Sequence, residues 1–127
     1  MTIQERPAGA VIILDLKGKL VLGDGEVRLK DKIHSLVFQG RSQFILNLAD
    51  VPFVDSSGLG TLCAALTTVR NVGGEIKLLN MTKRIHDLLA IAKLSTAFDT
   101  YDSEDDAVNS FSSAVRVSEP PSALAAS

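Results

Sequence analysis

The sequence predicts a small single-domain α/β fold, in which about four helices accompany a mixed sheet of four to five strands. Three observations support this fold class. The chain has 127 residues, 46% hydrophobic and 22% charged, which is typical of one globular domain. Short aliphatic runs alternate along it with segments of helical periodicity. Strands that alternate with helices pair in parallel through right-handed crossovers, so helices cover at least one face of the sheet.

The strands are predicted from short runs rich in aliphatic and β-branched residues. The clearest run, residues 11–16, lies between Gly9 and Gly18 and is hydrophobic enough for a buried strand. A shorter strand at 2–6 precedes it and is expected to pair with it through the turn at 7–9. The other strands are expected at 44–48, at 75–79 and, as a short one, at 97–101.

The helices are predicted from apolar residues that recur every three to four positions. The first spans 26–38, and Gly40 ends it. The second follows residues 55–58 and ends near Val72, the third surrounds 85–92, and the fourth runs from about 103 to 111. Their apolar stripes are Leu29, Ile33, Leu36 and Val37 in the first helix, Leu59, Leu62, Cys63, Leu66 and Val69 in the second, and Ile85, Leu88, Leu89 and Ala92 in the third. Cys63 is therefore expected to be a buried structural thiol.

Residues 1–111 are expected to form the domain, and residues 112–127 a tail. The tail is rich in Ser, Pro and Ala and has no hydrophobic periodicity. Such a composition cannot bury enough apolar surface to offset the entropy of ordering it, so we expect the tail to be mostly disordered.

Composition excludes several classes of function. Thirteen basic and fifteen acidic residues give a net charge of −2, so no direct nucleic-acid partner is expected. A single cysteine excludes an intramolecular disulfide and a cysteine-rich zinc site, and no motif indicates a cofactor or a metal. No segment reaches the roughly 18 apolar residues of a membrane helix. Because no secretory signal is visible either, a cytoplasmic protein without a membrane span is expected.

One segment, residues 55–60, carries a functional signal because it lies where a strand and loop lead into a helix. The first N–H groups of a helix lack intrahelical partners, and Asp55 or the serines after it are suited to bind them. Gly58 and Gly60 let another molecule approach the backbone closely. A helix cap with loop glycines is one interpretation of this pattern, and a binding site is the other.

The helix that follows adds a second observation. No charged residue occurs between Ser57 and Val69, whereas a solvated helix face normally carries Lys, Glu or Arg. The side away from the apolar stripe instead presents small or weakly polar residues, namely Ser57, Gly60, Thr61, Ala64 and Thr68. Such a face is suited to being covered, either by another part of this domain or by another protein.

The segment from Phe53 to Gly60 resembles the signature of the STAS family, specifically its bacterial anti-anti-sigma factors (anti-sigma factor antagonists). Residues 45–48, 73–75 and 78–80 also fall where that family places them, and the resemblance covers roughly residues 1–111. It implies a STAS-like fold and a protein that acts by partner switching. Unmodified, such a protein binds an anti-sigma factor that is also a serine kinase; phosphorylation ends the complex, and a phosphatase resets the cycle.

The resemblance also implies roles for individual residues. Ser56 corresponds to the phosphoacceptor, with Ser57 as the second choice, and the partner would contact Asp55, Ser57, Gly58, Gly60, Thr61, Ala64 and Thr68. The sequence departs from the family pattern in the loop after Gly18, where Val21 stands at a position that is usually polar. The kinase-facing loop is therefore expected to differ from that of typical members.

The sequence also bears on two other functions. A serine hydrolase is not expected, because the elbow pattern G-x-S-x-G is absent around Ser56 and only His34 and His86 are available as a base. We therefore predict that the chain is not an enzyme. The alternative binding function is a STAS domain that serves as a structural subunit, either of a signalling scaffold or of a transporter accessory complex.

Overall fold

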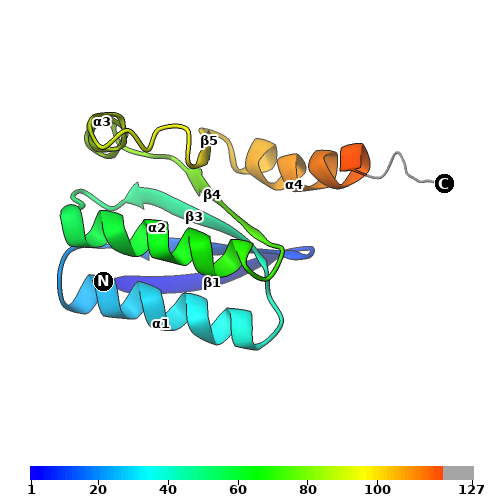
Figure 1. Cartoon of the computed structure of the whole chain (residues 1–127), viewed down its shortest axis with the longest axis horizontal. Helices are drawn as coiled ribbons and strands as arrows, with labels where there is room; N and C mark the ends of the chain where they lie inside the picture. Colours follow the sequence, from blue (N-terminus) through cyan, green and yellow to red (C-terminus); the bar gives the residue numbers. More distant parts are fainter. Residues whose placement is uncertain (119–127) are drawn as a thin grey trace.

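The computed structural model describes residues 1–118, and the side chains of residues 1–111 (Figure 1). Five strands and four helices follow one another along these residues. Their bounds are β1 (Thr2–Ala8), β2 (Val11–Lys17), α1 (Asp24–Phe38), β3 (Gln43–Asp50), α2 (Ser56–Arg70), β4 (Glu75–Leu79), α3 (Lys83–Ile91), β5 (Asp99–Tyr101) and α4 (Glu104–Ser118).

The strands form one mixed sheet in the order β1-β2-β3-β4-β5. β1 and β2 form an antiparallel hairpin, whereas β2, β3, β4 and β5 are parallel to their neighbours. Each parallel step contains one helix, α1, α2 or α3, as the alternation in the sequence predicts. The predicted α/β class, with a mixed sheet of four to five strands and about four helices, is confirmed.

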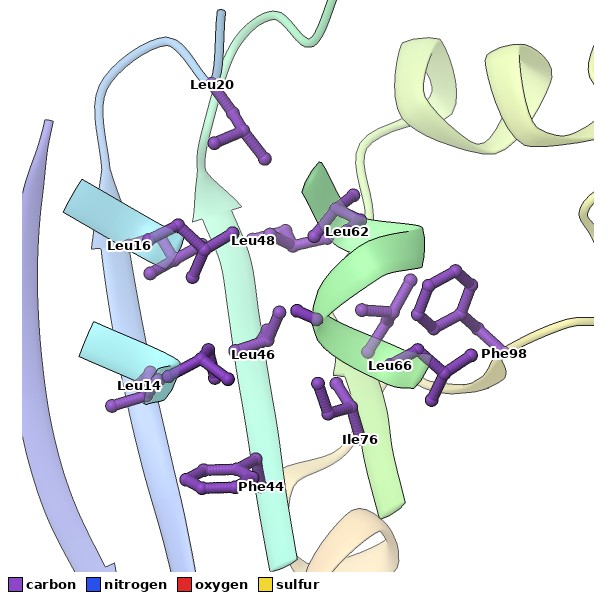
Figure 2. Packing of buried hydrophobic residues seen from close by; sticks show 14 of the residues in the cluster. Leu14, Leu16, Leu20, Phe44, Leu46, Leu48, Leu62, Leu66, Ile76 and Phe98 are labelled. Carbon is purple, nitrogen blue, oxygen red and sulfur yellow. The ribbon is translucent and has the colours of Figure 1, made fainter. Parts of the chain in front are cut away.

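The main core lies between one face of the sheet and the helices α1, α2 and α3. Alternate residues of β2 and β3 point to this face, so that Leu14 and Leu46 pack toward Leu62 and Leu66 of α2 (Figure 2). Phe98, which follows α3 in the chain, closes the core beside Leu66 (Figure 2). α1 and α2 lie side by side over the sheet (Figure 1). This packing fixes the position at which α2 begins.

The opposite face carries a smaller cluster under α4, built from Val11, Ile13, Ile45, Leu79, Ala107 and Phe111. Lys77 of β4 is buried on this face, where its Nζ lies 3.5 Å from a carboxylate oxygen of Asp99 and 4.8 Å from the centre of the Phe111 ring. An ion pair and a cation–π contact thus compensate the burial of its charge.

Several elements begin or end a few residues away from the predicted positions, and the largest difference is at the end of the last helix. α4 continues to Ser118, beyond the predicted end near Phe111, so that residues 112–118 of the predicted tail are helical. The rest of that tail, 119–127, lies outside the described residues. α1 begins at Asp24 instead of 26, because Gly23 leads into it with a φ of 100°. A glycine adopts that backbone conformation without strain, so the chain can turn into the helix two residues earlier.

Candidate functional site

The candidate site lies beyond the carboxyl ends of the parallel strands, where two loops meet. A single parallel bridge joins Leu20, in the loop after β2, to Val54, in the loop after β3. The Leu20 N–H donates to the carbonyl of Phe53 at 3.0 Å, and the Asp55 N–H donates to the carbonyl of Leu20 at 3.3 Å. Leu20 itself is fully buried above the strand ends (Figure 2). The start of α2 is therefore held by the loop after β2 as well as by β3.

Asp55 caps α2 and also binds the neighbouring loop. Its Oδ1 accepts the N–H of Gly58 at 2.7 Å, and its Oδ2 accepts the N–H of Leu22 at 3.1 Å. Hydrogen bonds from these backbone groups, that of Gly58 foremost, hold the pKa of the Asp55 carboxyl below its usual value. Asp55 is thus an ionised N-cap whose two oxygens connect the helix to the tip of the loop.

Gly58, which is expected to let a partner approach its backbone, is buried inside this domain. A Cβ at this position would lie 2.0 Å from the carbonyl oxygen of Leu20. The lack of a side chain at Gly58 therefore serves the contact between α2 and the loop inside this protein. Gly60 is different, because it is exposed and a Cβ there would meet nothing within 4 Å.

The two serines differ in exposure. Ser56 is the first residue of α2 and is exposed, next to the ionised Asp55. Ser57 is half-buried and lines a groove between α1 and α2, and its carbonyl accepts the hydroxyl of Thr61 at 3.0 Å. Of the pair, Ser56 is the hydroxyl that a second protein can reach with the least rearrangement.

The uncharged face of α2 is partly covered by α1. Thr61 is only 8% exposed because α1 packs beside it, so at this residue the cover comes from the same domain, one of the two alternatives that the sequence leaves open. Gly60 and Ala64 stay exposed, and Thr68 is half-buried. Between the two helices remains a groove of about 500 Å³. The uncharged face that another protein can reach is accordingly narrower than predicted, and consists of Gly60, Ala64 and part of Thr68.

Cys63 lies at the edge of the apolar stripe instead of inside it. Its side chain is half-buried against the main core, and burial raises the pKa of its thiol.

Leu22 is a site residue that the sequence did not indicate. Its N–H donates to Asp55, and its side chain is 70% exposed. Leu22 contributes its backbone N–H to the site, and every residue except proline has such a group, so the residue type could not indicate this role.

The sequence profile of the STAS domain family matches residues 3–107 of this chain. The chain belongs to the STAS domain family. Within this STAS domain, Val21 is half-buried in the loop after β2, and its carbonyl accepts the N–H of Glu26 at 3.2 Å.

Curated relatives of this STAS domain are anti-sigma factor antagonists. An anti-sigma F factor antagonist from Paenibacillus polymyxa is 26% identical over 98 residues, which cover 77% of this chain and 84% of that protein. An anti-sigma-B factor antagonist from Bacillus subtilis (strain 168) is 35% identical over 71 residues, which cover 56% of this chain and 64% of that protein.

Solved structures share the fold at lower identity. A candidate anti-sigma factor antagonist from Thermotoga maritima has a TM-score of 0.79 and 21% identity, over 85% of this chain and 92% of that one. The Bacillus cell fate determinant SpoIIAA in its phosphorylated form has a TM-score of 0.70 and 22% identity, over 87% of this chain and 99% of that one. A sulfate transporter family protein from Wolinella succinogenes has a TM-score of 0.68 and 18% identity, over 84% of this chain and 88% of that one.

Among residues 1–118 of this STAS domain, no helix combines the length and the apolar character needed to span a membrane.

Proposed function

We propose that this STAS domain is an anti-sigma factor antagonist of the cytoplasm that works by partner switching. In this proposal the unmodified protein binds an anti-sigma factor with serine kinase activity, phosphorylation of Ser56 ends the complex, and a phosphatase restores it. The observation that carries the proposal is the exposed hydroxyl of Ser56 on the first turn of α2, beside a face without charged side chains. The names of the curated relatives support the same function.

Electrostatics explains how one phosphate could act at this position. A phosphate adds about −1.5 to −2 charge, and the first turn of a helix tolerates an anion within the free protein. Asp55, however, is already ionised and already binds the Gly58 and Leu22 N–H groups. In a packed interface the phosphate would be desolvated next to the Asp55 carboxylate. Phosphorylation would therefore destabilise the complex more than it destabilises the free protein.

The proposed contact surface consists of Ser56, Gly60 and Ala64, with Asp55 and the exposed parts of Ser57 and Thr68 at its edge. The groove between α1 and α2 continues this surface, because Ser57, Gly60 and Ala64 line it. Gly60 and Ala64 lie one turn apart on α2. Small residues at that spacing let a partner approach the helix backbone closely.

The test measures binding and phosphorylation with purified anti-sigma factor kinases of the source organism. By titration calorimetry, Ser56→Ala should bind as tightly as wild type, because it removes a hydroxyl and adds no charge. Ser56→Asp should bind more weakly, and Ala64→Arg should not bind. Ala90→Arg is the matched control, since Ala90 is an exposed helical alanine on α3, away from this surface.

Incubation with kinase and ATP then identifies the acceptor. Wild type and Ser57→Ala should gain one phosphate in an intact-mass spectrum, whereas Ser56→Ala should gain none. Phosphorylation of Ser56→Ala would move the acceptor to another hydroxyl. Wild-type affinity of Ala64→Arg would place the interface elsewhere on the molecule.

A structural subunit of a transporter or a scaffold is the second candidate. The likeness to the sulfate transporter family protein from Wolinella succinogenes favours it at the level of fold. In that case no anti-sigma factor kinase of the source organism would bind or phosphorylate the chain. The same experiments therefore distinguish the two functions.

A further inference from the structure

A second groove lies between the β3–α2 loop and α3. It has a volume of about 510 Å³. Its apolar lining consists of Phe53, Val54, Leu88 and Ile91. Phe53 and Val54 directly precede Asp55 and Ser56, so the groove begins where the candidate site ends.

Apolar side chains are unusually accessible along this groove. Ile91 is 80% exposed and Phe53 is 37% exposed, while Val54 and Leu88 form the deeper part and also pack against the main core. Single exposed apolar residues are common on protein surfaces, but several gathered in one recess mark an interaction site. The recess suits side chains that insert into it.

The rim of the groove is basic although the chain as a whole is acidic. Lys83 and Arg84 edge the groove against a single acid, Asp87, whereas the net charge of the chain is −2. Lys83 lies 3.5 Å from Asp87, so these two charges offset each other. The guanidinium carbon of Arg84 lies 5.7 Å from the centre of the Phe53 ring. This cation–π contact holds over the apolar lining a positive charge that forms no ion pair within residues 1–111.

The length of the groove indicates what fits it. Arg84, Leu88 and Ile91 follow one another at helical spacing along α3, so they span about 10 Å, or two turns. A partner helix with apolar residues at i, i+3 or i+4, and i+7 presents anchors over the same length. Acidic residues beside those anchors would meet Arg84 and complement the rim.

We propose that this groove binds an amphipathic, acidic helical segment of a partner protein. This surface is distinct from the α2 face, and its occupation does not depend on an anti-sigma factor or on phosphorylation. A membrane surface fits less well, because Val54 is buried and Leu88 is half-buried, which leaves Ile91 as the one strongly exposed apolar side chain of the groove.

The experiment titrates the ¹⁵N-labelled full chain with an 18-residue amphipathic peptide and follows the amide resonances. The peptide carries Leu at i, i+3, i+4 and i+7 with Glu at the flanking positions, and a second peptide has Lys in place of each Glu. The test variants are Arg84→Glu and Ile91→Ser. Their matched controls are Arg41→Glu and Phe38→Ser, which make similar changes at exposed residues just after α1 and at its end, outside the groove.

The proposal expects the acidic peptide to shift the amides of residues 53–54 and 84–91. Arg84→Glu should weaken that binding about tenfold, since one favourable charge contact is lost and one repulsive contact is gained. The same variant should bind the Lys peptide better than wild type does. Ile91→Ser should also weaken binding, whereas both controls should stay within about twofold of wild type.

Several results would overturn the proposal. The acidic peptide could fail to bind, could bind with shifts centred elsewhere, or could bind no better than the Lys peptide. Equal losses of affinity for the acidic peptide in Arg84→Glu and Arg41→Glu would show that binding depends only on the net charge of the chain. Vesicles of equal parts phosphatidylglycerol and phosphatidylcholine serve as the membrane arm. Sedimentation of the protein with them in a manner that depends on Arg84 and Ile91 would assign the groove to a lipid surface instead.

Discussion

Gly58 permits a sharp test of how the candidate site is built. A Cβ there would lie 2.0 Å from the Leu20 carbonyl oxygen and 2.8 Å from its carbonyl carbon. Gly→Ala in a helix normally stabilises a protein by about 1 kcal/mol. In Gly58→Ala the Leu20 carbonyl would have to move by roughly 1 Å or more before its oxygen reached van der Waals distance from the new Cβ. Overpacking of this kind costs about 1–3 kcal/mol or more. We therefore expect Gly58→Ala to lower the free energy of unfolding by about 1–2 kcal/mol.

Gly60→Ala is the matched control, since it lies two residues later in the same helix and its Cβ would meet nothing within 4 Å. This variant should gain up to about 1 kcal/mol. Urea denaturation followed by circular dichroism measures both changes, and the midpoint urea concentrations of the two variants should differ from wild type in opposite directions. If Gly58→Ala were as stable as Gly60→Ala, the close contact between α2 and the loop at Leu20 would be wrong, and with it the way Ser56 is positioned.

Three further predictions concern other parts of the molecule. In Asp55→Asn the amide oxygen can still cap α2, but its NH₂ group would face the N–H of Leu22, so hydrogen exchange of that amide should accelerate while helicity is kept; unchanged exchange would contradict the bond. The Arg6 guanidinium lowers the pKa of Asp15, so this carboxylate stabilises the fold above its unfolded pKa of about 3.9, and the contribution is lost as pH falls through the lower folded value. In Asp15→Asn the free energy of unfolding should fall less steeply as pH is lowered below about 4. An unchanged slope would show that the contact between Arg6 and Asp15 does not cause the acid sensitivity. Cys63 is half-buried and the pKa of its thiol is raised, so native protein should react with a thiol reagent more slowly than unfolded protein. Equal rates would show that the thiol is fully accessible in the folded protein.

Much of the fold could be predicted because its determinants are local. Residues 75–79 were expected as a strand and form β4, since an aliphatic run between two turn signals has few other conformations. The capping role of Asp55 was also readable, because an N-cap interacts with N–H groups only a few residues away. Parallel pairing followed from the alternation of strands and helices alone.

Other features depend on contacts between distant segments. A helical wheel separates the faces of α2 but does not say that α1 would cover Thr61. Nor does the glycine pattern distinguish Gly58, which meets the carbonyl of Leu20, from Gly60, which meets nothing. The acidic start of the last helix was visible, whereas its continuation to Ser118 was hidden by a segment without clear periodicity. Thr61 and Gly58 are buried by residues that are distant in the sequence, and hydrophobic periodicity reports only on residues a few positions apart. In the extension of α4 that periodicity is itself absent.

Ser56 lies in the chain between residues of the two candidate surfaces, and this position constrains how a single phosphate could act. On one side Gly60 and Ala64 extend along α2, and on the other Phe53 and Val54 lead into the groove beside α3. A partner that used both surfaces would have to pass over Ser56 with little room for water. A phosphate there would then oppose contact with both surfaces at once, although it adds only about two negative charges. A partner that used the α3 groove alone would keep most of its affinity after phosphorylation. Binding of the anti-sigma factor to Ile91→Ser, a change in the α3 groove, therefore separates the two cases. A loss of affinity would indicate a switch that uses both surfaces, and wild-type affinity would indicate a switch at the α2 surface alone.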